Sequence, residues 1–189
     1  MHGPASPGWL LVALCAATGA YCLLRMRSRD DEARRAAGGE ALMGFGMAAM
    51  AVPAAAFTPP AWTWAAYAAV FGAAGLRALW AVARHGGHHL HHLVGAAAMV
   101  YMAVVMAGSP AHAHGASGPP AATGVLLLYF TGYVLLTGVR LLPVAAVAGG
   151  GSRATRWGDR ATGWGDRPEL ARACRLSMGI AMLAMLAAM

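Results

Sequence analysis

The sequence predicts an all-α protein, a polytopic membrane bundle of about six transmembrane helices that forms one domain over residues 1–189. Composition is the first reason, because 59% of the residues are hydrophobic and only 11% are charged, whereas a soluble domain carries about 25% charged residues. The second reason is that the apolar segments are long runs rich in Ala, Leu and Met, while an outer-membrane barrel would show short alternating segments. Within a bilayer, such runs satisfy their backbone hydrogen bonds internally as helices.

Six apolar runs mark the predicted spans, since a helix needs about 17–25 residues to cross a bilayer core of about 30 Å. The predicted spans are residues 8–24, 40–57, 62–82, 93–107, 124–142 and 170–188. Pro59 and Pro60 end the second run, and Trp62 and Trp64 open the third at the membrane interface. The first run is followed rather than preceded by arginines, which is typical of a retained span and not of a cleaved signal peptide.

The arginines predict the orientation of the bundle. They follow the first, third and fifth runs, whereas the connections at 58–61 and 108–123 contain none. Because cytoplasmic loops carry the excess of positive charge, we expect a multi-pass protein of the plasma membrane with both termini extracytoplasmic. The net charge of +7 reflects these loops and does not indicate nucleic-acid binding. The absence of lysine and the abundance of Ala and Gly are typical of a high-GC genome such as that of an actinobacterium.

Methionines recur on one helical face in three of the runs. In the second run, Met43, Met47 and Met50 are spaced four and three residues apart, which places their thioethers on one side of a helix. The fourth and sixth runs repeat this arrangement with Met99, Met102, Met106, Met178, Met182, Met185 and Met189.

The predicted topology arranges these methionines in layers. The second, fourth and sixth runs point in the same direction, so residues can be compared by depth at a rise of about 1.5 Å per residue. If Glu40, His92 and Cys174 start at equal depth, two layers result. They are Met47/Met99/Met182 and Met50/Met102/Met185.

The chemistry of these side chains indicates copper. Thioethers are soft, neutral ligands that select Cu(I), and they avoid the desolvation cost of a carboxylate inside a membrane. His88 and His92 lie four residues apart before the fourth run, and imidazole also binds copper. The predicted metal-binding residues are Glu40, Met43, Met47, Met50, His88, His92, Met99, Met102, Met106, Met178, Met182 and Met185.

Three short motifs stand out along runs two to six. They are Glu40-x-x-Met43-x-x-x-Met47-x-x-Met50, then His88-x-x-x-His92 leading to Met99-x-x-Met102, and the Met-rich last run. In these motifs the chain resembles an uncharacterised family of small actinobacterial integral-membrane proteins, known only as a domain of unknown function. The resemblance implies a membrane protein and supplies no established activity.

The favoured function is therefore a membrane protein that binds or moves Cu(I). Its expected partners are the lipid bilayer and the copper ion, with a copper chaperone or a second copy as further candidates and no nucleic acid. One alternative is a redox enzyme or electron carrier in which His and Met hold a metal or haem. Another is a structural protein in which the methionines only pack helices. The sequence shows no nucleophile elbow, P-loop, dinucleotide fingerprint or HExxH, and it leaves open whether the protein is an enzyme.

Overall fold

The computed structural model describes residues 6–27, 31–53, 56, 58–85, 90–108, 118–141 and 168–189. Within these ranges the chain forms helices and no strand, which confirms the all-α prediction. The helices are α1 (Ser6–Arg25), α2 (Asp31–Met50), α3 (Ala61–His85), α4 (Leu90–Gly108), α5 (Pro120–Leu141) and α6 (Pro168–Ala187).

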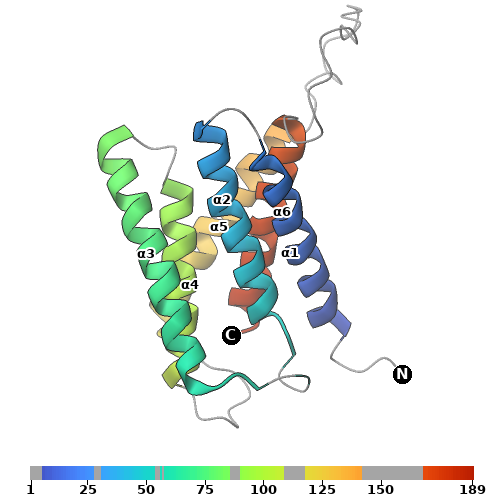
Figure 1. Ribbon diagram of the computed structural model, residues 1–189. Coiled ribbons are helices and arrows are strands. Elements are labelled where there is room, and N and C mark those ends of the chain that lie inside the picture. Colours follow the sequence, from blue (N-terminus) through green and yellow to red (C-terminus); the bar gives the residue numbers. More distant parts are fainter. Residues whose placement is uncertain are drawn as a thin grey trace, which may run out of the picture.

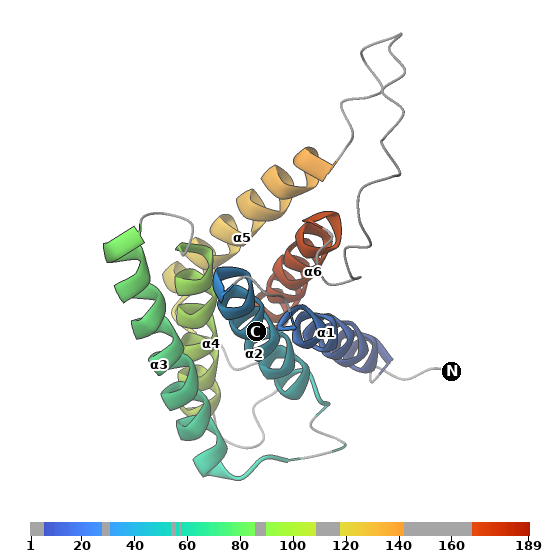
Figure 2. The same ribbon diagram turned by 45° about the horizontal axis from the view of Figure 1, so that its top comes forward.

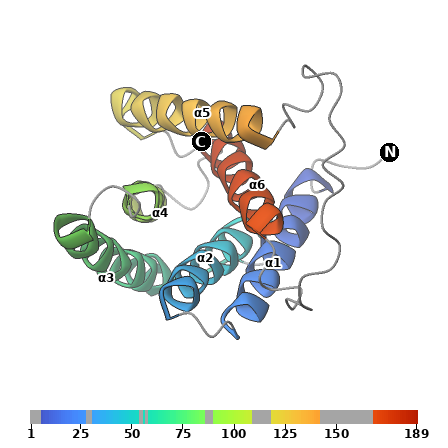
Figure 3. The same ribbon diagram turned by 90° about the horizontal axis from the view of Figure 1, so that it is seen from above.

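The bundle is built from three antiparallel hairpins, α1 with α2, α3 with α4, and α5 with α6. Consequently α2, α4 and α6 run in one direction and the other three helices run in the opposite direction (Figure 1). Helix α4 lies next to both α3 and α2 (Figure 2), and α2 also contacts α6. Viewed along the bundle, α2, α4 and α6 surround the centre, and α3 and α5 lie outside (Figure 3).

Five helices are long and apolar enough to span a membrane, so the chain is a multi-pass membrane protein. In the outer helices α3 and α5, only 6% of the residues in an apolar 18-residue segment are buried. In α4 and α6 the corresponding share is 33%. Large side chains such as Leu76 and Leu128 are accordingly 70% and 76% exposed. In a bilayer these faces would contact lipid tails, because exposed apolar side chains of this density are not stable in water.

Helix α2 differs from its prediction and from its neighbours. The predicted span was 40–57, whereas the helix begins at Asp31 and ends at Met50. The sequence argument followed the apolar run and therefore missed a polar first part, where Arg34 and Asp31 form an exposed ion pair of 2.6 Å one helical turn apart. Glu40, which was predicted to begin a span, therefore lies in the middle of α2.

Charge is distributed unevenly along the bundle axis. The arginines whose side chains the structure describes lie at one end, near the end of α1 and α3 and the start of α2 and α6. At the other end, the described residues include no Asp, Glu, Lys or Arg. Trp62, at the start of α3, lies at this uncharged end and is 69% exposed, as expected for an aromatic residue at a membrane interface.

Candidate functional site

Six methionines meet in the centre of the bundle, contributed by α2, α4 and α6. They belong to one cluster of buried side chains, and none is more than 8% exposed. We call Met43, Met47, Met99, Met102, Met178 and Met182 the methionine core. Phe71 and Phe130 are buried in the same cluster. The three helical faces predicted from the methionine spacing therefore do face one another in the fold.

Two glycines fix how α2 and α4 pass each other. A Cβ atom added to Gly95 would lie 2.8 Å from the sulfur of Met43. A Cβ atom added to Gly46 would lie 3.1 Å from the methyl carbon of Met99 and closer still to the ring of Phe71. The missing side chains thus make room for methionine, and they place residues 43–46 level with residues 95–99. This is the depth relation on which the predicted layers depend.

An ion pair sets the depth of α6. The Nε atom of Arg175 lies 2.7 Å from Oε1 of Glu40, so the part of α6 around Arg175 lies beside the middle of α2. Met178 and Met182 follow on α6 as Met43 and Met47 follow on α2. The contacts therefore agree with a common starting depth for the three inner helices.

The remaining predicted metal residues lie at the edge of this core or outside it. Met50 and Met185 are half-buried and pack against it, whereas Met106 is 36% exposed on α4. His92 is half-buried at the arginine-bearing end, close to Gly39 of α2. His88 lies outside the described residues. The structure thus groups the inner methionines and separates Met106 from them.

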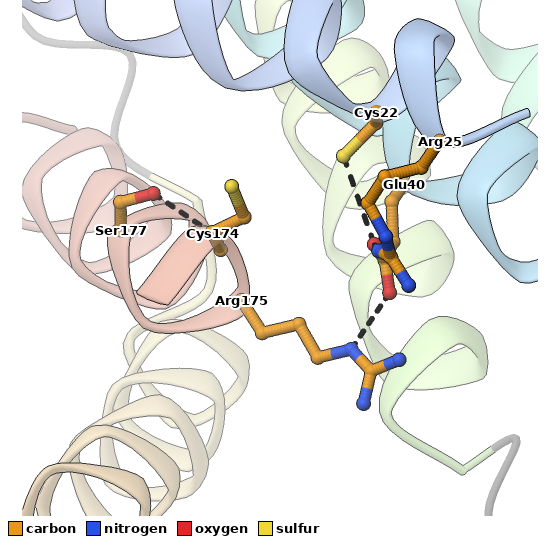
Figure 4. Close-up of polar contacts among 6 residues, drawn as sticks. All are labelled: Cys22, Arg25, Glu40, Cys174, Arg175 and Ser177. Carbon is orange, nitrogen blue, oxygen red and sulfur yellow. Dashed lines mark hydrogen bonds and ion pairs between the residues drawn. The ribbon is translucent and has the colours of Figure 1, made fainter. Parts of the chain in front are cut away.

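The carboxylate of Glu40 is held between two arginines rather than directed at the methionines. Its Oε2 atom lies 2.6 Å from Nη1 of Arg25, and its Oε1 atom accepts the bond from Arg175 (Figure 4). Glu40 is only 1% exposed. We call Arg25, Glu40 and Arg175 the arginine–glutamate cluster. It joins α1, α2 and α6 at the arginine-bearing end of the bundle.

The energetics of this cluster follow from its burial. Charge-assisted bonds between guanidinium and carboxylate are short and strong, but removing charges from water opposes their attraction. The cluster is also unbalanced, with two positive charges and one negative charge. Arg25 and Glu40 are nearly buried, whereas the side chain of Arg175 is 39% exposed, so water partly screens its charge. The excess positive charge favours a nearby anion.

Two thiols lie beside the cluster. The Sγ atom of Cys22 is 3.6 Å from Oε2 of Glu40, and Cys22 is fully buried. Cys174 lies on α6, one residue before Arg175, whose guanidinium binds the same carboxylate. Figure 4 shows the Cys22 sulfur directed toward α6. We call Cys22 and Cys174 the thiol pair; both are free cysteines. Thr18 and Ser177 form a further contact of 3.3 Å between the same two helices.

His91 lies in an aromatic cluster at the same end. Its ring stacks on Tyr133 of α5, with centroids 3.8 Å apart and planes 9° apart, and Phe130 meets it edge-on. Its Nδ1 atom is buried without a hydrogen-bond partner among the residues that the structure describes. One face of the imidazole is thus covered by a phenol ring.

The donors available for a metal are soft ones. In the part of the chain that the structure describes, no three His, Cys, Asp or Glu side chains are grouped so as to hold a metal ion. This excludes a typical zinc site within those ranges, because structural zinc takes four such ligands. Thioethers are a different donor class, and the methionine core supplies them from three helices.

Sequence reasoning missed the arginine–glutamate cluster and the thiol pair. Arg25 was interpreted as the first cation of a cytoplasmic loop, although its side chain is nearly buried. Arg175 carried a usable signal, because it falls inside the predicted span 170–188, where a charged residue indicates a partner. Glu40 was the only acidic residue in the six predicted spans. The pairing of Arg175 with Glu40 could therefore have been inferred.

The fold and the site define a multi-pass α-helical membrane protein with a sulfur-rich centre and a buried ionic cluster at one end. The chain belongs to the family described as a domain of unknown function, DUF5134, whose model matches residues 32–189. The matched range includes the methionine core, Glu40 and Cys174, while Cys22 and Arg25 of α1 lie before it. No curated protein and no solved structure matches the chain.

Proposed function

We propose that this protein binds Cu(I) within the plasma membrane, through the thioethers of the methionine core, in order to store, transfer or transport it. One observation carries the proposal. Three parallel helices each bury methionines in a single cluster, and the contacts at Gly95, Gly46 and Glu40 hold those helices in a common register.

The physical argument rests on the match between ion and site. Cu(I) is monovalent and soft, and it prefers thioether and thiolate sulfur to oxygen. A neutral methionine site holds such an ion without burying a ligand charge, which is the costly step for carboxylates in a membrane. The alternative function is helix packing alone, because methionine fills irregular spaces in cores. The two functions differ in what they predict for leucine substitutions.

The experiment replaces sulfur while keeping volume. Met47, Met99 and Met182 are changed together to Leu, because Leu and Met exchange in cores at a cost of less than about 1.5 kcal/mol each. Cu(I) affinity of the purified protein in detergent is measured by competition with a chromophoric Cu(I) chelator. We expect the triple variant to bind Cu(I) at least about tenfold more weakly, by analogy with other changes around metal ligands.

The matched control is Met26→Leu. Met26 is 38% exposed near the end of α1 and lies outside the methionine core, so this variant should keep the affinity of the parent protein. Unchanged Cu(I) binding in the triple variant, with the helical content preserved, would show that the methionines serve packing only.

Within the core, Met102→Leu should weaken Cu(I) binding more than Met43→Leu. Met102 lies deeper in the bundle and is 2% exposed, against 8% for Met43.

We also propose that the arginine-bearing end faces the cytoplasm and that both termini are extracytoplasmic. Support comes from the segregation of described arginines to one end, since positive residues are retained on the cytoplasmic side. A C-terminal alkaline phosphatase fusion should then be active in a bacterial host, and a C-terminal green fluorescent protein should stay dark. The opposite pair of results would reverse the orientation. In the proposed orientation, a cytosolic copper chaperone would meet the end that carries the thiol pair.

A further inference from the structure

The thiol pair of Cys22 and Cys174 is a binding site that the proposed function does not use. We propose that it takes one soft monovalent cation, Cu(I) or Ag(I), between two sulfurs, and that it lies before the methionine core on the route of the ion. The role as an earlier station rests on the function proposed above, whereas the site itself rests on the geometry around Glu40.

The position of the two thiols fits a two-coordinate ion. They come from different helices, α1 and α6, and both lie beside the same carboxylate. Cys22 Sγ is 3.6 Å from Oε2 of Glu40, and Cys174 directly precedes Arg175, which binds Oε1 of Glu40 (Figure 4). Cys22 is fully buried and Cys174 is half-buried. Thiolates bind soft metals, and a soft monovalent ion is satisfied by fewer donors than zinc, which takes four in structural sites.

The charges nearby favour the anionic form of this pair. Arg25 and Arg175 contribute two positive charges and Glu40 one negative charge, which leaves an excess of one positive charge. A thiol pair that holds a single proton carries one negative charge, and with it the whole group of side chains becomes neutral. Thiolates are indeed favoured beside arginine. The arginine–glutamate cluster therefore supplies a reason for one of the two cysteines to be deprotonated.

A soft cation can then replace the shared proton without changing the total charge. Two sulfur–metal bonds form, the remaining sulfur–hydrogen bond breaks, and the proton leaves to solvent; no electron is transferred. A divalent ion in the same place would leave one uncompensated positive charge beside the nearly buried guanidinium of Arg25, which opposes its binding. The site thus selects monovalent over divalent ions by charge as well as by softness.

The sequence on α6 connects this site to the methionine core. Cys174, Met178 and Met182 are spaced four residues apart and so lie along one face of the helix. Met178 and Met182 are buried in the core cluster. An ion released by the thiol pair would find the next sulfur one helical turn further into the bundle.

The test uses Ag(I), which is soft, monovalent and stable to oxidation. The number of Ag(I) ions bound per chain and the number of protons released are measured on purified protein in detergent. In Cys22→Ser/Cys174→Ser we expect about one ion fewer per chain and the loss of about one released proton, because metal binding displaces protons from its thiol ligands. Cys15→Ser is the matched control. Cys15 is equally buried on α1 but outside the thiol pair, and its replacement should change neither number.

The same measurements separate this inference from the proposed function. If the cysteine variant binds and releases as the parent does, the thiol site is refuted, whatever the methionine triple variant shows. If the cysteine variant loses its ion and proton while the methionine triple variant binds normally, the thiol site stands and the function of the methionine core fails. Equal effects of Cys15→Ser and the double variant would also refute the assignment.

A spectroscopic measurement on the unmodified protein covers the case in which a variant fails to fold. X-ray absorption at the silver edge, with one Ag(I) per chain, reports the ligands of the first ion bound. We expect two sulfur ligands at thiolate distance. A first ion bound by nitrogen or oxygen, or by thioethers alone, would overturn the proposal.

Discussion

The arginine-bearing end and the methionine centre hold the same inner helices together by opposite means. At the charged end, a few short bonds converge on one carboxylate, with Arg25 and Arg175 at 2.6 Å and 2.7 Å from Glu40. In the centre, many weak contacts are shared among buried thioethers, aromatic rings and small residues. The first region depends on the identity of single atoms, and the second depends on volume and shape.

This difference governs what each region tolerates. A bundle in lipid gains little from the hydrophobic effect between helices, so close packing and polar contacts decide how helices associate. Packing is distributed over the cluster and adapts to a changed side chain, since methionine is flexible. The ionic contacts are concentrated on Glu40 and have no substitute. The charged end should therefore be sensitive to isosteric changes and the centre insensitive to them.

The largest effect is expected for Glu40→Gln. The substitution keeps the shape of the side chain but removes the negative charge, which leaves two arginines beside each other and one of them nearly buried. Breaking a buried pair by removal of one partner costs about 3–5 kcal/mol. We expect a clear fall of the thermal unfolding midpoint in detergent.

Asp31→Asn provides the control for this prediction. It removes an ion pair of the same length on the same helix, but Arg34 and Asp31 are 51% and 64% exposed. Exposed pairs contribute about 0–1 kcal/mol, so the unfolding midpoint should hardly move. Equal losses in the two variants would mean that burial does not distinguish these pairs, and the contrast between the two regions would lose its basis.

The methionine centre was accessible to sequence reasoning because it is periodic. Spacings of three and four residues determine the face of a helix, and consistent arginine placement gave the relative direction of the helices. With the assumption that Glu40, His92 and Cys174 start at equal depth, they predicted that Met47, Met99 and Met182 approach one depth. The contacts of Gly46 and Gly95 agree with that register for α2 and α4. Whether these methionines bind a metal stays a prediction.

The charged end was less accessible because it is not periodic. Its members come from three helices, at positions 25, 40 and 175, and no local pattern links them. The prediction that α2 begins at 40 also concealed that Glu40 lies deep in the bundle, since hydropathy identifies apolar runs and not helices with a polar first part. A charged residue within a predicted span was the one available signal.

A small effect is expected for Met99→Leu, which tests the other half of the comparison. Met99 is fully buried against Gly46 of α2, and its exposed fraction of 0% matches the 1% of Glu40. Leucine keeps the volume, and such exchanges in cores cost less than about 1.5 kcal/mol; the unfolding midpoint should fall much less than in Glu40→Gln. Met99→Ala leaves a cavity and should cost about 2–5 kcal/mol, which shows that the position is sensitive to volume. If Met99→Leu were as damaging as Met99→Ala, the centre would depend on the sulfur atom itself even without metal, and the two regions would be alike.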